Sequence, residues 1–339
     1  MHHPTPPTFP LARSGAGPAP LRRPRSVRRT TTLETRWPDG LGGAIEMVGR
    51  ARDAVTPADG GAPVVHASGA LHITSSSQRQ ILSIATEPAH PRAQELVGVR
   101  AGGASREALG RAMGDVRGAP VYQMIDDFAG ASLVCEWIWP QWRPELVRLK
   151  RAIEGEERAR RMLDVCTGWA EGSSAFAVFD AARPPDQNRT FDRTEVAPLQ
   201  NPDDLQGWHE MSTFPGPSTR RARRIDLWAD GDLLRVDAGF QDSGSTPDGA
   251  RVAVHEYRVF AAFDADTTEL RTLEVQPLIL PFPECPGASL KAAKMLGQPV
   301  AEFRRRVIED LSHTEGCTHL NDVLRSLADA PNLAALLHA

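Results

Sequence analysis

The chain has 339 residues, which is enough for two domains of ordinary size or one large one. Hydrophobic residues make up 41% of the sequence and charged residues 24%, so a packed core is available and disorder of the whole chain is excluded. Only Lys150, Lys291 and Lys294 are lysines, and all other basic residues are arginines. Arginine binds phosphate groups well, but the formal net charge of −4 argues against a protein that binds nucleic acid over its whole surface.

The cysteine content and the hydropathy of the chain bear on its compartment. Four cysteines, Cys135, Cys166, Cys285 and Cys317, are too few for a disulfide scaffold. No apolar run approaches the roughly 18–20 residues that span a bilayer, and the N-terminus lacks the apolar stretch of a signal peptide. We therefore expect a cytoplasmic protein without a membrane partner.

Residues 1–26 form a proline-rich start with four arginines, Arg13, Arg22, Arg23 and Arg25, and no acidic residue. Little apolar surface is available there to offset the entropy of ordering the chain, so we expect a disordered tail. The alternative is a basic arm that binds an acidic partner or nucleic acid. No aromatic residues lie between the arginines, as they do in many segments that bind single strands.

The arginine cluster considered in the rest of the chain is Arg220, Arg221, Arg223 and Arg224. The cluster lies in a stretch rich in proline, glycine, serine and threonine, and we expect it to be the solvated entrance to a strand. A net acidic domain needs a segregated basic face to bind nucleic acid, and this cluster is too small to provide one. We therefore predict no nucleic-acid partner.

The first half of the chain is predicted to consist of strands followed by helices. β-forming residues and turn signals predict a four-stranded antiparallel meander over residues 28–37, 44–55, 64–75 and 79–86. Apolar spacing then predicts helices over residues 105–113, from about 120 to 133, and over 144–165, the last with a break allowed near Gly155.

The second half repeats this order. Residues 181–218 are rich in proline, asparagine, aspartate, glutamine and glycine and are predicted to be an exposed insertion or linker. Strands are predicted over residues 224–228, 232–240, 250–263 and 269–276, and helices over about 287–296, 299–311 and 318–329.

These elements predict an α+β fold with an N-terminal half at 27–180 and a C-terminal half at 219–339. Each half has antiparallel strands followed by helices, and glycines recur at similar spacing in both, from Gly98 to Gly118 and from Gly297 to Gly316. The two halves are therefore candidates for an internal duplication, packed as one sandwich-like unit. Different strand orders in the two halves would contradict this hypothesis.

Common cofactor signatures are absent from the sequence. It contains no Gly-x-Gly-x-x-Gly after a strand, no phosphate-binding Gly-x-x-x-x-Gly-Lys-Ser/Thr and no Gly-x-Ser-x-Gly elbow. It also contains no His-Glu-x-x-His and no Cys-x-x-Cys. No cofactor is predicted, and a nucleotide-binding or kinase-like protein is not supported.

The densest polar cluster lies near the C-terminus. His255 and Glu256 are neighbours in a predicted strand and therefore point to opposite faces of the sheet. Cys285 precedes a proline that suits a first helical turn, and Cys317 opens the last predicted helix, with Thr318 as its N-cap. A thiol at a helix N-terminus experiences a positive dipole, which favours thiolate.

The same cluster supplies a proton carrier and a carboxylate. His319 and Asp322 are three residues apart and share one face of the last helix. His319 or His255 is the candidate proton carrier, Glu256 or Asp322 the group that orients it, and a cysteine the nucleophile or ligand. A transition-metal site made of two cysteines and two histidines is a narrower alternative.

Each of these residues also has a purely structural interpretation. A cysteine among apolar residues is most often a small buried hydrophobe, and Asp322 can complement a helix dipole. His255 can be a core histidine with satisfied hydrogen bonds. If the thiols lie in separate apolar clusters, the motif is helix capping and core packing, and the chain is a non-enzymatic module that binds a ligand or a partner.

Two further features have weaker functional interpretations. Asp126 and Asp127 are adjacent in a predicted helix, where neighbours do not face each other, and we expect a solvated edge. Trp137, Trp139 and Trp142 form an aromatic patch that lines a pocket, forms an interface or packs in the core.

Several blocks of the sequence resemble a bacterial family of unknown function, numbered 2889. The blocks are Val254-His255-Glu256-Tyr257, Leu280 to Ala288, and Cys317-Thr318-His319-Leu320-Asn321-Asp322 with Leu324 to Asp329. An N-terminal block is similar at Arg28, Arg29, Arg36, Asp39, Gly40 and Leu41. The resemblance is scattered over about residues 27–330 and implies the longer, actinobacterial type of member. It implies no reaction.

The chain departs from this family's pattern at two places. Tyr122-Gln123-Met124 stands where shorter members have His-Asp-Met, and Phe240-Gln241-Asp242-Ser243-Gly244 stands where long members have Phe-Arg-Asp-Ser-His. These departures place any role for a site in the first half in doubt. We expect a small-molecule enzyme with acid–base chemistry, of hydratase, isomerase or hydrolase type, at the C-terminal histidines and cysteines, with a binding module as the alternative. Convergence of His255, His319, Cys285 and Cys317 within about 4–6 Å inside a cleft would favour the enzyme.

Overall fold

The computed structural model describes residues 6–179 and 194–338, and its centre is one nine-stranded antiparallel sheet. The strands are β1 (Ser26–Arg36), β2 (Ile45–Thr56), β3 (Val64–Ser75), β4 (Ile81–Glu87), β5 (Thr194–Glu195), β6 (Ser218–Asp230), β7 (Leu233–Ser245), β8 (Arg251–Asp264) and β9 (Leu270–Ile279). Their order is β4-β3-β2-β1-β6-β7-β8, and both β9 and the short β5 pair with β8.

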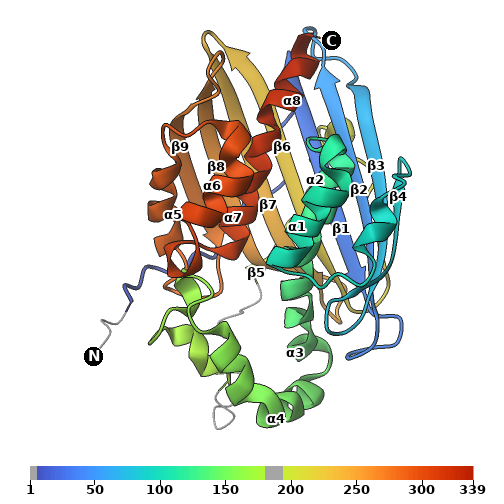
Figure 1. Ribbon diagram of the computed structural model, residues 1–339, viewed down its shortest axis with the longest axis vertical. Coiled ribbons are helices and arrows are strands. Elements are labelled where there is room, and N and C mark those ends of the chain that lie inside the picture. The colour runs from blue at the N-terminus through green and yellow to red at the C-terminus, as the bar shows by residue number, and fades with distance from the viewer. Residues whose placement is uncertain (1–5, 180–193, 339) are drawn as a thin grey trace.

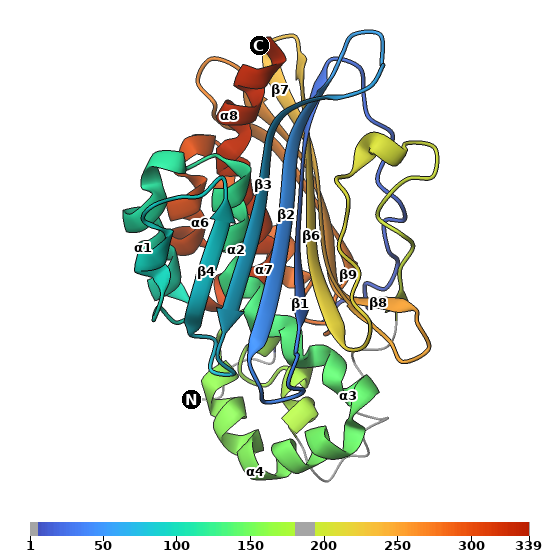
Figure 2. The same ribbon diagram turned by 90° about the vertical axis from the view of Figure 1, so that its right-hand side faces the viewer.

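Helices cover one face of this sheet (Figure 1). They are α1 (Gly103–Met113), α2 (Pro120–Val134), α3 (Trp139–Trp142), α4 (Pro144–Met162), α5 (Gly287–Lys291), α6 (Phe303–Asp310), α7 (Thr318–Ser326) and α8 (Ala330–Ala335). Helices α3 and α4 lie beyond one end of the sheet, whereas the chain before β1 and the chain that leads into β6 cross the opposite face (Figure 2). The predicted α+β class is confirmed. No helix among residues 6–179 and 194–338 is long and apolar enough to cross a membrane.

The sheet consists of two meanders joined edge to edge. Strands β1–β4 form one meander and β6–β9 the other, and β1 pairs with β6 from Ser26↔Trp228 to Arg36↔Ser218. Strand order from the junction outward is the same in both halves, with the second meander again followed by helices. This order is what duplication would produce. Internal duplication stays a prediction, because equal strand order does not establish equal geometry.

The segments predicted to be tail and linker have specific contacts where the structure describes them. Residues 180–193 of the predicted linker lie outside the described residues. Further along, Trp208 and His209 are buried beneath the sheet. In the predicted tail, the backbone N–H of Phe9 donates to Pro283 O at 2.8 Å and that of Ala19 donates to Leu199 O at 2.9 Å. Residues 6–25 therefore lie against the folded chain, an arrangement that the expectation of a disordered tail did not include.

Two apolar cores lie between the helices and the sheet, one beneath α1 and α2 and the other beneath α5–α8. The arginine cluster of the second half lies in β6, the strand at the junction between them. Arg221 and Arg223 point to the helix side, where they pair with Asp322 of α7 and Asp127 of α2. Arg220 and Arg224 point to the other face, where Arg220 pairs with Glu34. The predicted solvated strand entrance is therefore wrong: all four arginines are buried, and each forms an ion pair with a carboxylate that compensates its charge.

The helix-side pairs belong to a continuous buried network of six arginines and six aspartates. The arginines are Arg29, Arg106, Arg221, Arg223, Arg304 and Arg325, and the aspartates are Asp53, Asp126, Asp127, Asp242, Asp322 and Asp329. This network corrects a further expectation, because Asp126 and Asp127 are buried ion-pair partners and not a solvated edge. It ties the helices of both halves to the sheet and ends at Asp242.

Candidate functional site

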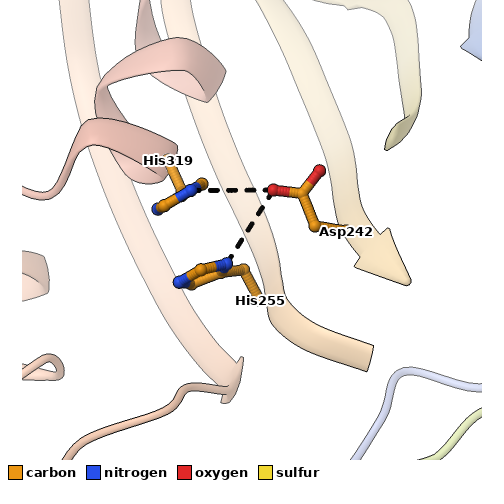
Figure 3. Close-up of side chains that lie close together, drawn as sticks. All are labelled: Asp242, His255 and His319. Atoms are coloured by element: carbon orange, nitrogen blue, oxygen red, sulfur yellow. Dashed lines mark ion pairs between the residues drawn. The ribbon is translucent and has the colours of Figure 1, made fainter. Parts of the chain in front are cut away.

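Asp242, His255 and His319 meet at the end of this network (Figure 3). Asp242 and His255 are direct cross-strand partners in β7 and β8, next to a bulge between Asp242 and Ser243. His319 lies in the first turn of α7, which packs over these strands. Asp242 Oδ2 is 3.8 Å from His255 Nδ1 and 3.7 Å from His319 Nε2. A bulge of this kind redirects side chains locally and is common beside functional sites.

The two imidazoles are stacked on each other. Their ring centroids are 3.5 Å apart and their planes differ by 15°. His255 Nδ1 and His319 Nε2 are buried and have no hydrogen-bond partner in the described structure, since their distances to Asp242 exceed a hydrogen bond. The second nitrogen of each ring points away from Asp242 (Figure 3). His319 Nδ1 lies 3.3 Å from Thr318 Oγ1 and 3.8 Å from Cys317 Sγ.

Both histidines are held in the neutral form. Burial lowers the pKa of His255 well below its usual value, and neighbouring His319 lowers it further, although Asp242 opposes the shift. Burial lowers the pKa of His319 in the same way, and Arg221 adds to the effect. Because His319 lowers the pKa of His255, protonation of one ring disfavours protonation of the other.

Asp242 is fixed by Arg221, whose Nε and Nη2 donate to its two carboxylate oxygens at 2.9 and 2.8 Å. Arg221 Nη1 also donates to Asp322 Oδ2 at 2.8 Å, and its guanidinium lies over the ring of Phe240. This bidentate pair sets the orientation of the carboxylate toward the two imidazoles. The Asp242 carboxylate is the negative charge that faces the histidines in the described structure.

A cavity of about 220 Å³ adjoins the histidines. Its lining is mainly apolar and includes Trp137, Trp139, Trp169 and Phe282, together with His255, His319, Cys285 and Cys317. The sequence-predicted histidines and cysteines therefore do meet around one cavity, and the tryptophan patch contributes to its wall. An engineered apolar cavity of about 150 Å³ takes up benzene, so this one has room for a somewhat larger small molecule.

The cysteines of the cavity are thiols and not thiolates. Burial raises the pKa of Cys317 and of Cys285, and it raises the pKa of Cys166 to about 12. Cys317 itself is the N-cap of α7, one residue before the predicted Thr318, and its neighbouring backbone N–H groups only partly oppose the shift. The thiolate expected from the helix N-terminus is therefore not supported, because burial outweighs the helix effect.

The two carboxylates proposed from the sequence do not touch the histidines. Glu256 lies on the opposite face of the sheet, where its Oε1 accepts a hydrogen bond from the backbone N–H of Ala16 at 3.1 Å. Asp322 is buried between Arg221 and Arg106. Neither forms an ion pair with His255 or His319 in the described structure. The carboxylate that faces both rings is instead that of Asp242, at 3.8 and 3.7 Å, and Asp322 is linked to it through Arg221.

The sequence contained a signal for Asp242 that residue types alone did not reveal. The predicted strands at 232–240 and 250–263 form a hairpin, and extending its register by two residues sets Asp242 opposite His255. Arg221 had no comparable signal, because its partners Asp242 and Asp322 come from other elements.

Asp242, His255 and His319 also offer the donor atoms of a metal site, since one ligand atom of each lies within 4.8 Å of the others. Lone pairs of imidazole lie in the ring plane, however, and these two rings are nearly parallel. An ion midway between them would lie up to ~1.7 Å out of each plane, which is most of a zinc–nitrogen bond of about 2.0–2.1 Å. A shared ion would therefore require one ring to rotate, and the arrangement described here suits two side-by-side proton carriers better. Cys285 and Cys317, the two cysteines of the alternative metal site, are not part of this donor group.

Comparison with known proteins bears on the C-terminal part of the chain. Residues 219–332 match the model of a family described as "Protein of unknown function (DUF2889)". The resemblance is thereby confirmed over this segment, which contains Asp242, His255 and His319, whereas the N-terminal blocks lie outside it. A search of curated proteins and a search of solved structures found no match.

Proposed function

We propose that this chain, whose C-terminal part carries the family match, is an enzyme that acts on an apolar small molecule by proton transfer at His255 and His319. The observation that carries the proposal is the pair of neutral imidazoles in the wall of an apolar cavity, with a fixed carboxylate behind them. A buried histidine with no functional role normally has its ring nitrogens hydrogen-bonded. Here His255 Nδ1 and His319 Nε2 have no hydrogen-bond partner in the part of the chain that the structure describes.

The residues suit a general base. A neutral imidazole accepts a proton from a substrate C–H or from a water molecule without first losing one. The imidazolium that forms is stabilised by Asp242, whose carboxylate is within 3.8 Å of both rings and is fixed by Arg221. Because the rings disfavour double protonation, the pair carries one proton at a time and returns it to the product. The reaction classes that need only this step are hydration, isomerisation and hydrolysis.

Deuterium exchange tests the proposal without knowledge of the natural reaction. The protein is incubated in D₂O with a panel of apolar acids, ketones and esters somewhat larger than benzene, and deuterium entering carbon positions is measured by mass spectrometry. We expect exchange that falls about 10²–10⁴-fold in H255Q and H319Q. H66Q is the matched control, because His66 lies exposed on β3. Exchange that is equal in all four proteins would contradict the proposal.

The alternative function, a module that binds a small molecule without reacting with it, also predicts a cavity of this kind. The unpartnered ring nitrogens favour the enzyme. A ligand that binds tightly, exchanges no deuterium and binds H255Q and H319Q as well as it binds the original protein would favour the module.

A further inference from the structure

Helix α4 lines the cavity with four charged residues, Lys150, Arg151, Glu154 and Arg158, beside Val147 and Met162, and it leaves two large apolar residues in solvent. Leu149 and Ile153 are 59% and 74% exposed, whereas Lys150, Arg151 and Arg158 line the cavity. A helix that only closed a hydrophobic core would have the opposite orientation, with leucine and isoleucine inward. The inward cations therefore require a partner of their own.

One acid of the cavity contacts two of the three cations. Glu136 Oε2 accepts a hydrogen bond from Lys150 at 3.0 Å and lies 3.8 Å from Arg158. Arg151 forms no ion pair or side-chain hydrogen bond within the described part of the chain. Burial lowers the pKa of Arg151, and Arg158 lowers it further, with no acid to oppose them. Glu154, which also lines the cavity, is not paired with it in this structure.

An unpaired, half-buried guanidinium beside an apolar cavity has the chemistry of an anion anchor. We propose that Arg151 binds the carboxylate of an apolar carboxylic acid whose hydrocarbon part fills the cavity. A single guanidinium offers one positive charge and a planar fork that matches one carboxylate. The three cations of the cavity wall and its two carboxylates, Glu136 and Glu154, leave one positive charge, which balances one carboxylate but not a dianionic phosphate.

The apolar part of such a ligand has a matching surface. Trp137, Trp169 and Phe282 line the cavity between α4 and the strand that carries His255. Flat aromatic walls and a volume somewhat above that of a benzene site suit an aryl or short alkyl acid. This assignment of a substrate class rests on the proposed function only for the reaction that follows binding, because the anchor itself involves neither histidine.

Calorimetric binding of three isosteric probes tests the anchor: 3-phenylpropanoate, 3-phenylpropan-1-ol and 3-phenylpropylamine. We expect the carboxylate to bind at least about tenfold more tightly than the alcohol, because its hydrogen bond to the guanidinium is charge-assisted. The amine should bind most weakly. In R151Q the carboxylate should fall to the affinity of the alcohol, while alcohol binding changes little. R160Q is the matched control, because Arg160 is an exposed arginine of the same helix.

Two outcomes would overturn the anchor: equal affinity for acid and alcohol in the original protein, or an acid preference that R151Q retains. Absence of binding by all three probes would overturn it as well. The same titration in H255Q separates the two proposals. Acid binding that needs Arg151 but not His255, in a protein without deuterium exchange, sustains the anchor and refutes the proton chemistry. Exchange that needs His255 with no role for Arg151 does the reverse.

Discussion

Gly130 provides a test of the buried network. A glycine-to-alanine change inside a helix usually stabilises the protein, but at this position the added methyl carbon should destabilise it. Gly130 lies inside α2, where alanine is ordinarily the better helix former by about 0.8–1.0 kcal/mol. A Cβ at this position would overlap Arg221 Nη1 and Asp322 Oδ2, which form the ion pair that leads to Asp242. Overpacking typically destabilises a protein by about 1–3 kcal/mol, and breaking a buried ion pair by about 3–5 kcal/mol. We therefore expect G130A to be less stable by about 2–4 kcal/mol after the helix gain is subtracted.

Urea unfolding of G130A beside G110A measures this effect. Gly110 lies in α1, where the nearest atom to an added Cβ is Arg117 Nη2 at 3.5 Å, an ordinary contact. G110A should gain about 0.4–1 kcal/mol, so the two variants should move the unfolding midpoint in opposite directions at equal slope. If G130A were as stable as G110A, the tight packing of α2 against the Arg221–Asp322 pair would be refuted. A gain in G130A would refute it more strongly.

Four further outcomes follow from the same structure. D322N should lower the free energy of unfolding by about 3 kcal/mol, because it removes a negative charge that Arg221 and Arg106 share. D266N, at an exposed turn, should change the free energy by less than about 0.5 kcal/mol, and equal urea midpoints for the two variants would contradict this. Burial lowers the pKa of His209 to about 3, so between about pH 6.5 and 3 the imidazole takes up a proton only in the unfolded state. The free energy of unfolding should therefore fall by about 1.4 kcal/mol for each unit that the pH is lowered in this range, and the dependence on pH should be weaker in H209Q; an equal dependence would refute the reasoning. Burial raises the pKa of Cys166 to about 12, and the three thiols of the cavity should react with iodoacetamide at neutral pH far more slowly than a free cysteine, although the reagent is small enough to enter; modification as fast as that of a free thiol would disagree. The rate of deuterium exchange should be unchanged after dialysis against a chelator. If the active protein contains stoichiometric metal and loses exchange when the metal is removed, the mechanism is metal-assisted instead.

The secondary structure was largely predictable, because it depends on local patterns. In the first half, the predicted strands at 28–37, 44–55, 64–75 and 79–86 correspond to β1–β4, and the three predicted helices correspond to α1, α2 and α4. Alternation and helical spacing are imposed residue by residue, so a sequence shows them directly. The break allowed at Gly155 did not occur, and α4 continues through it.

The candidate site was predictable only in part. His255, His319, Cys285 and Cys317 were proposed from their spacing to helix starts and strand faces, and they do line one cavity. Asp242 was not proposed, because its role depends on a strand register and a bulge between β7 and β8. The state of the thiols also escaped sequence reasoning, since burial depends on everything packed around Cys317.

The buried arginines show most clearly which properties could not be inferred from the sequence. By itself it determined the class of the fold, the order of strands and helices, the lack of common cofactor motifs and the concentration of histidines and cysteines near the C-terminus. A charged run such as residues 220–224 looks solvent-exposed in any sequence, because burying charge is unfavourable unless a partner is present. Only the tertiary structure supplied the partners, by bringing Asp127, Asp242 and Asp322 from three other elements to Arg221 and Arg223. Compensation of charge is a long-range property of the packed chain, and the same packing made the cavity beside Arg151 and left that arginine without an ion-pair partner among residues 6–179 and 194–338.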